Sequence, residues 1–195
     1  MGKGRLEAFS DGVIAVIITI MVLELKVPHG ADLDAIAPML PAFLGYVLSF
    51  VFIGIYWNNH HHLLHTVAHI DAKIMWANLH LLFWLSLVPA ATGWIGENPY
   101  ASVPTAIYGF LLFMCGFAYL FLSRAIIAHH GKDSELGRAV GNDVKGLISQ
   151  AAYAAAVPLA FVAHWISDAL YVAVAVMWFV PDRRISRVVA PDHDH

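Results

Sequence analysis

The sequence predicts an all-α, polytopic membrane protein with six transmembrane helices. Of its 195 residues, 59% are hydrophobic and only 13% are charged, whereas about 25% of residues are charged in ordinary soluble domains. Long apolar segments recur along the chain and are separated by short polar connections. The predicted transmembrane helices cover residues 6–27, 39–56, 74–95, 104–127, 147–163 and 167–180, within one membrane domain of residues 1–182 that a polar tail of residues 183–195 follows.

The distribution of basic residues also supports six spans. Six crossings place both termini on one side of the membrane, and ten of the 11 Lys and Arg residues then lie on that side, with only Lys26 opposite. A missed or an additional helix would scatter these charges over both sides. Because basic residues concentrate in cytoplasmic loops, we expect a multi-pass protein of the cell membrane with both termini in the cytoplasm.

The first apolar segment, from Leu6 to Val27, is long enough to cross a bilayer. At about 1.5 Å per residue it extends over about 33 Å, and a bilayer has a hydrocarbon core of about 30 Å. Asp11 lies near its start, and an acidic residue within a membrane helix costs about 2.5 to 3.5 kcal/mol on insertion scales. We therefore expect Asp11 to face protein or water and to have a polar partner.

One face of this segment is apolar along its whole length. At about 100° per residue its members fall within about 40° of one line, with Thr19 beside them, whereas Ser10 and Asp11 point more than about 100° away. The stripe suits a pore or a partner helix. The opposite side is equally apolar, so periodicity leaves open whether this is simply a packed core helix. The stripe consists of Phe9, Gly12, Val16, Ile20, Leu23 and Val27.

The second and third spans carry polar residues that can partner Asp11. Trp57, His60, His61 and Asn78 are expected near the terminal ends of these two spans, at the depth of Asp11. Interhelical hydrogen bonds in membranes stabilise by about 0.6 to 2 kcal/mol each. We interpret these residues as a structural network rather than a catalytic set.

Three histidines that follow the second span suggest a different interpretation. His61, His65 and His69 are spaced four residues apart and share one face if the helix continues. Neutral imidazoles at that spacing bind zinc, but histidines at a membrane interface are also ordinary hydrogen-bonding residues. We expect no resident metal, and a zinc site on this face is the weaker alternative.

The later spans are connected by a turn and by one longer polar stretch. Residues 96–100 contain turn residues and no Lys or Arg. The most polar stretch, residues 129–145, follows the fourth span, and a tight turn at residues 164–168 joins the last two. The single cysteine, Cys115, can form no intrachain disulfide.

Composition and motifs argue against several other functions. A net charge of -3 and apolar aromatic segments offer no basic surface for nucleic acid. The sequence contains no Gly-x-Ser-x-Gly, no His-Glu-x-x-His and no phosphate-binding glycine loop. We expect no enzymatic activity and no cofactor. The potassium-channel filter Thr-Val-Gly-Tyr-Gly is also absent.

The opening residues follow the pattern Arg-x-x-x-Phe-Ser-Asp before an apolar helix. In this pattern the sequence resembles the transmembrane protein 175 family of potassium channels, whose bacterial members have one six-span repeat per subunit. The resemblance covers nearly the whole chain, and the opening motif is its most specific part. The residues assigned by it, or by depth, to a structural network are Arg5, Phe9, Ser10, Asp11, Trp57, His60, His61 and Asn78.

The resemblance implies a homotetramer in which four copies of the first helix line a central pore. Potassium is then the permeant ion, membrane lipid surrounds the subunits, and apolar rings set selectivity and gating. Counted from Asp11, the rings fall at Val16, Ile20 and Leu23, with Thr19 as an adjacent hydroxyl position. All lie on or beside the apolar stripe. The family usually has a bulkier Ile or Leu at the position of Val16, and we expect the central Ile20 to form the driest ring.

Two other classes of protein remain possible on the sequence alone. A secondary transporter for a metal ion or for protons would place coupling residues at mid-membrane, whereas here the middle of the first helix is apolar and the acids lie at its ends. A membrane enzyme or a structural helix bundle would need no pore. Single-channel currents distinguish a channel from these alternatives.

Overall fold

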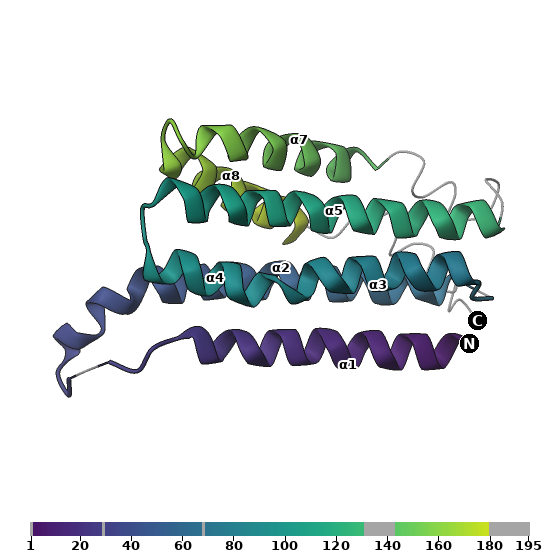
Figure 1. Ribbon diagram of the computed structural model, residues 1–195, viewed down its shortest axis with the longest axis horizontal. Coiled ribbons are helices and arrows are strands. Elements are labelled where there is room, and N and C mark those ends of the chain that lie inside the picture. The colour runs from purple at the N-terminus through teal and green to yellow at the C-terminus, as the bar shows by residue number, and fades with distance from the viewer. Residues whose placement is uncertain (1, 29, 68, 131–142, 180–195) are drawn as a thin grey trace, which may run out of the picture.

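The computed structural model describes residues 2–28, 30–67, 69–130 and 143–179, and this part of the chain is all-α (Figure 1). Three short 3-10 helices, η1 (Val22–Glu24), η2 (Leu33–Ala35) and η3 (Ala37–Met39), lie between the first two α-helices. The α-helices are α1 (Lys3–Met21), α2 (Leu40–His65), α3 (Ala72–Ser86), α4 (Val88–Glu97), α5 (Ser102–His130), α7 (Val144–Leu159) and α8 (His164–Phe179).

The helices run roughly along one common direction, with α1 at one edge of the bundle (Figure 1). The first helix packs mainly against α2, α3 and α4, and α5 packs against α3, α4, α7 and α8. The core between them is formed by branched and large apolar side chains that solvent does not reach. Its most completely buried members include Ile14, Met21, Ile53, Leu64, Ile74, Leu81, Leu85, Leu112 and Leu122.

Among the described residues, four helical segments are long and apolar enough to cross a membrane. They cover Lys3–Glu24, Leu33–His65, Ala72–Glu97 and Ser102–His129. Each of α7 and α8 has 16 residues, slightly fewer than the roughly 17 to 25 residues of a typical spanning helix. The expected all-α, multi-pass architecture is therefore present. The polar tail, residues 183–195, and the middle of the polar stretch after α5 lie outside the described residues.

Several helix boundaries differ from the sequence-based prediction. The predicted turn at residues 164–168 is wrong, because α8 already begins at His164 and α7 ends at Leu159. The α-helix of the first segment ends at Met21, and after η1 the backbone is extended at Leu25, so Val27 leaves the helical stripe. A proline at position 28 disfavours helix at the residue before it. The second helix instead continues past Tyr56 to His65, because no Gly or Pro interrupts residues 57–65.

The predicted third span is two helices rather than one. α3 ends at Ser86 and α4 begins at Val88, with Leu87 between them and its N–H bonded to the Trp84 carbonyl 3.2 Å away. Pro89, in the first turn of α4, has no N–H to continue the ladder of a single helix. The two helices remain nearly collinear (Figure 1), so they still form one membrane segment.

Two glycines let α7 and α8 pack closely on α5. A Cβ atom at Gly109 would collide with the Tyr171 hydroxyl of α8, and one at Gly116 would collide with the Gln150 amide of α7. Small residues at helix interfaces allow this close approach in membrane proteins. The Tyr171 hydroxyl then donates to the Thr105 carbonyl at 2.9 Å, which ties α8 to the start of α5.

Basic residues of the described helices gather at one end of the bundle. Lys3, Lys73 and Lys145 lie in the first turns of α1, α3 and α7, and Arg124 lies in the last part of α5. These helix ends are all at the side of the N-terminus (Figure 1). We call this the terminal end. Asp71 caps α3 there, and the N–H of Ile74, 2.7 Å from its Oδ1, holds the pKa of Asp71 below its ordinary value.

Candidate functional site

The two faces of α1 have opposite environments. Ile14, Ile17 and Met21 are at most 4% exposed and pack into the bundle, whereas Val16 is 54%, Ile20 42% and Leu23 78% exposed. The structure thus resolves a choice that periodicity left open. The uncovered side, called here the α1 apolar face, consists of Phe9, Gly12, Val16, Ile20 and Leu23, with Thr19 beside it.

Thr19 carries the polar side chain of this face. Its hydroxyl donates to the carbonyl of Val16 at 2.9 Å, within the same helix. A hydroxyl has one proton and two lone pairs. Because its proton is donated within the helix, the Thr19 hydroxyl presents only its oxygen, as a hydrogen-bond acceptor, on an otherwise apolar surface.

A chain of hydrogen bonds joins α1, α2 and α3 near the terminal end. Asn78 on α3 donates from Nδ2 to the Ser10 hydroxyl on α1 at 2.9 Å, and its Oδ1 accepts from His60 Nε2 on α2 at 2.6 Å. Ser10 in turn donates to the Leu6 carbonyl at 2.8 Å. All three side chains are buried. This bonding pattern places the proton of the His60 ring on Nε2, because Oδ1 can only accept.

Asp11 has its own partner beside that chain. The indole Nε1 of Trp57 donates to Asp11 Oδ1 at 3.0 Å, between α1 and α2. The ring of His61 stacks on Trp57, with centroids 6.3 Å apart and planes 29° apart. Asp11 therefore points toward α2 and away from the α1 apolar face.

Two residues assigned to the network by sequence lie elsewhere. Phe9 is 48% exposed and belongs to the α1 apolar face. Arg5 is also exposed, and within the described ranges no hydrogen bond or ion pair reaches its side chain. The structure therefore brings together Ser10, Asn78 and His60, and separately Asp11 with Trp57, but it does not join Arg5 or Phe9 to either group.

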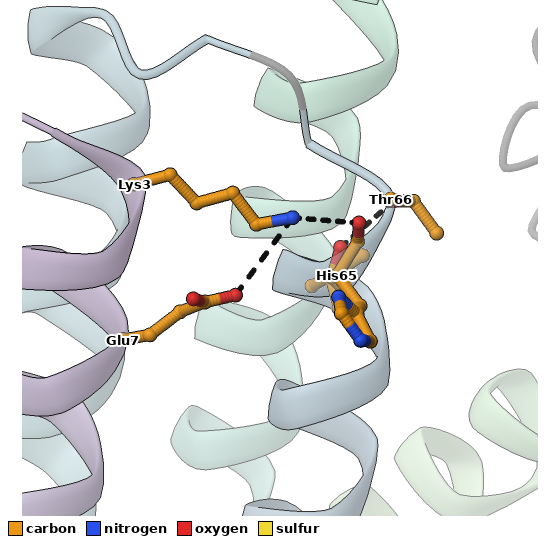
Figure 2. A network of polar contacts seen from close by, with 5 residues as sticks. Lys3, Glu7, His65 and Thr66 are labelled. Atoms are coloured by element: carbon orange, nitrogen blue, oxygen red, sulfur yellow. Dashed lines mark hydrogen bonds and ion pairs between the residues drawn. The ribbon is translucent and has the colours of Figure 1, made fainter.

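A lysine that sequence reasoning did not select fastens the start of α1. Lys3 Nζ donates to the backbone carbonyl of His65 at 2.8 Å and lies 3.9 Å from the Glu7 carboxylate (Figure 2). The carbonyls at a helix C-terminus lack intrahelical donors, and a cation there also complements the helix dipole. Thr66 closes the same turn by donating to the Leu63 carbonyl at 2.8 Å. The N-terminal turn of α1 is thus attached to the last turn of α2.

A second buried polar cluster lies deeper in the bundle and was also missed. The Ser49 hydroxyl is 2.7 Å from Thr92 Oγ1 and 2.8 Å from the Tyr108 hydroxyl, which joins α2, α4 and α5. Thr92 donates its proton to the Val88 carbonyl. Ser49 must then donate to Thr92 and accept from Tyr108, because each hydroxyl has a single proton. The sequence does place hydroxyl residues on these neighbouring spans, which could have indicated the cluster. The depth of Thr92 in the membrane, however, depends on the helix break after Ser86.

The histidine face predicted from the sequence is shorter than expected. α2 ends at His65, so His69 lies outside the helix and does not continue the face of His61 and His65. Within the described ranges, no group of three or more His, Cys, Asp or Glu side chains is arranged to hold a metal ion.

Acidic residues dominate the end opposite the terminal end. Glu24, Asp32, Asp34 and Glu97 lie there with one lysine, Lys26, whose Nζ is 2.8 Å from Glu97 Oε1. The Glu24 carboxylate lies against Gly93 of α4, where a Cβ atom would collide with it. Lys26 is therefore engaged by a carboxylate while the other three acids remain exposed.

These features define an all-helical, multi-pass membrane protein with one exposed apolar helix face. A family model described as the endosomal/lysosomal potassium channel TMEM175 matches residues 5–89. A potassium channel of Chryseobacterium sp. (strain P1-3) is 51% identical over 187 residues, which cover 96% of this chain and 97% of that protein. The chain belongs to the TMEM175 family, a family of channels and not of enzymes.

Two further relatives have different extents of similarity. The crystal structure of a lysosomal potassium-selective channel TMEM175 homologue from Chamaesiphon minutus matches with a TM-score of 0.81 and 28% identity, covering 93% of this chain and 97% of that one. The endosomal/lysosomal proton channel TMEM175 of Gallus gallus is 34% identical over 103 residues, only 47% of this chain and 21% of that protein.

Proposed function

We propose that this protein is a potassium-selective channel of the cell membrane in which four subunits place α1 around a central pore. Each subunit crosses the membrane six times, with α7 and α8 as the last two crossings and with both termini in the cytoplasm. The Chryseobacterium protein, which is similar over nearly the full length of this chain, is named a potassium channel, and this supports potassium as the permeant ion. The gathering of basic residues at the terminal end supports the orientation.

The observation that carries this proposal is the uncovered apolar face of α1. α1 is buried on one side by its own subunit and exposed on the other at Val16 and Ile20, and Leu23 of η1 continues this exposed side. Further copies of the chain cover this face in the tetramer, and its residues then form successive apolar rings. The partly buried acid near its start, Asp11, faces α2 and stays out of the pore.

The amount of water inside an apolar ring determines both which ions pass and whether the pore conducts. A ring of branched side chains can close a pore by dewetting. An ion that holds its water more strongly than potassium loses more on passing such a ring, so potassium is favoured over sodium. No cofactor is needed for this mechanism, and Thr19 adds a polar oxygen between the rings of Val16 and Ile20.

Ile20 forms the decisive ring in this proposal. It lies one turn beyond Val16, near the middle of the uncharged run from Gly12 to Leu23, and has one more side-chain carbon than valine. It is also the less exposed of the two within the single subunit. The ring that is larger and more central should be the driest.

The proposal is tested in lipid vesicles and planar bilayers. Purified protein should release a potassium gradient and give single-channel currents. Ile20→Asn, which holds water in the constriction, should shift the reversal potential under bi-ionic potassium and sodium toward equal permeability, and Val16→Asn should do so less. An unchanged reversal potential in Ile20→Asn with a large shift in Val16→Asn would assign selectivity to the position of Val16.

Proton conduction is the second candidate function. TMEM175 relatives from animals, such as that of Gallus gallus, are named proton channels. A secondary transporter for protons or for a metal ion is the related alternative, but the α1 apolar face offers it no titratable residue. A pH-sensitive dye inside the same vesicles distinguishes these functions, since a potassium channel dissipates a potassium gradient without net proton movement when a counter-ion pathway is provided.

A further inference from the structure

We propose that His61 and His65, on the last two turns of α2, bind one divalent transition-metal ion of the zinc class. The two residues are four positions apart on one continuous helix, and both are exposed. Side chains at this spacing are neighbours on a helix surface. This site lies outside the α1 apolar face, and its existence does not depend on the proposed channel function.

The separation of the two rings fits joint coordination. Their centroids are 5.5 Å apart and their planes differ by 52°. With a metal–nitrogen bond of about 2.1 Å and a ring centre about 1.1 Å behind the nitrogen, two imidazoles at a tetrahedral angle have centroids about 5.2 Å apart. The observed centroid separation of 5.5 Å lies within a few tenths of an ångström of that value.

Both rings are available to a ligand. Among the described residues no hydrogen bond reaches either imidazole, although the His65 backbone carbonyl accepts from Lys3. The neighbouring His60 is different, because it is 1% exposed and its Nε2 is bonded to Asn78. Stacking on Trp57, which Asp11 fixes, restrains the ring of His61 and reduces the entropy lost on binding.

The set of ligands indicates the class of metal. Imidazole nitrogen suits Zn²⁺, Cu²⁺ and Ni²⁺ better than Mg²⁺ or Ca²⁺, which prefer oxygen. His62 projects about 100° from His61 around the helix, and His69 lies beyond the end of α2. Two protein ligands leave the remaining positions to water, which predicts a reversible site. The nearby charges of Lys3 and Glu7 are opposite and 3.9 Å apart, so they largely offset each other.

Metal binding here would also affect the attachment of α1. An ion shared by the two histidines fastens the turn that ends at His65, and the carbonyl of His65 accepts from Lys3 of α1 (Figure 2). An ion that binds the folded state stabilises it by mass action. Zinc should therefore raise the thermal midpoint of the protein, and because imidazole binds metal only when neutral, acidification should remove the effect.

The experiment compares zinc binding by variants of the full chain, purified without a histidine tag. Isothermal titration in detergent should show that His61→Gln and His65→Gln each bind one Zn²⁺ fewer per subunit than the parent, or bind it at least tenfold more weakly. His69→Gln is the matched control, because it removes a nearby histidine outside α2, and it should bind as the parent does. Size-exclusion profiles verify that each variant is folded.

Thermal unfolding provides a second measurement. Zinc should raise the midpoint of the parent and of His69→Gln, but not that of the His61→Gln/His65→Gln double variant. Equal zinc binding by the parent and by both single variants would overturn the site. A loss in His69→Gln as large as in His65→Gln would also overturn the assignment to a pair on α2. None of these outcomes depends on potassium flux, so the site can fail while the channel function stands.

Discussion

Two buried polar clusters of similar chemistry differ in what they connect. The Ser10, His60 and Asn78 cluster joins α1 to α2 and α3, whereas the Ser49, Thr92 and Tyr108 cluster joins α2, α4 and α5. Only the first includes α1. We therefore expect a polar cluster to affect the proposed pore only if it contacts α1. The burial of the cluster and the number of its hydrogen bonds should be less important.

The largest expected effect is that of Asn78→Leu in the first cluster. The substitution keeps a similar size but leaves the His60 ring and the Ser10 hydroxyl without their shared partner. An unpaired buried donor such as His60 Nε2 costs about 1 to 3 kcal/mol, and the bond that Ser10 accepts, lost while it still donates to the Leu6 carbonyl, is worth about 0.5 to 1.5 kcal/mol. We therefore expect a loss of about 2 to 4 kcal/mol in stability and the loss of most of the assembled tetramer. Size-exclusion chromatography and thermal unfolding measure both. A His60→Leu/Asn78→Leu double variant should recover part of the loss.

Asp11→Ala should have the next largest effect. Trp57 loses its acceptor at a partly exposed position, for which about 1 to 3 kcal/mol is expected, and the tetramer should dissociate more readily on size-exclusion. Asp11→Asn retains the acceptor oxygen and should assemble nearly as the parent does. Normal assembly of Asp11→Ala together with altered ion selectivity would place Asp11 in the pore and contradict the contrast between the two faces of α1.

Ser49→Ala, in the second cluster, should have the smallest effect on function. The Tyr108 hydroxyl loses its acceptor, which should lower the free energy of unfolding by about 1 to 2 kcal/mol. The ratio of potassium to sodium permeability should stay the same, because α1 keeps all its contacts. Reversal potentials and thermal unfolding of one preparation provide the two readouts. A changed permeability ratio would show that the second cluster also acts on the pore.

Much of the architecture follows from hydropathy and charge, because a helix that crosses a membrane must be apolar and of a minimum length. The break at Leu87 was missed although Pro89 marks it, since hydropathy averages over a single proline. Val27 was placed in the helix although position 28 is a proline. In both places the proline indicated the end of a helix, but the prediction followed the apolar pattern instead.

The contacts of the site were predictable only in part. Counting residues from helix ends placed Asp11 near Trp57 and Asn78 near His60, as the structure has them. It could not show that the Arg5 side chain points outward or that Lys3 reaches the end of α2. The choice between the two apolar faces of α1 also requires the position of its neighbours, which only tertiary packing determines.

The carboxylates at the end opposite the terminal end give the described part of the protein an electrical polarity. Lys26 and Glu97 neutralise each other, so Glu24, Asp32 and Asp34 leave this end negative, while basic side chains gather at the other. Such a field raises the local concentration of cations and lowers that of anions near the surface. Its range is about 8 Å at physiological salt and about 30 Å at 0.01 M. The enrichment of cations near this end is therefore greatest at low ionic strength.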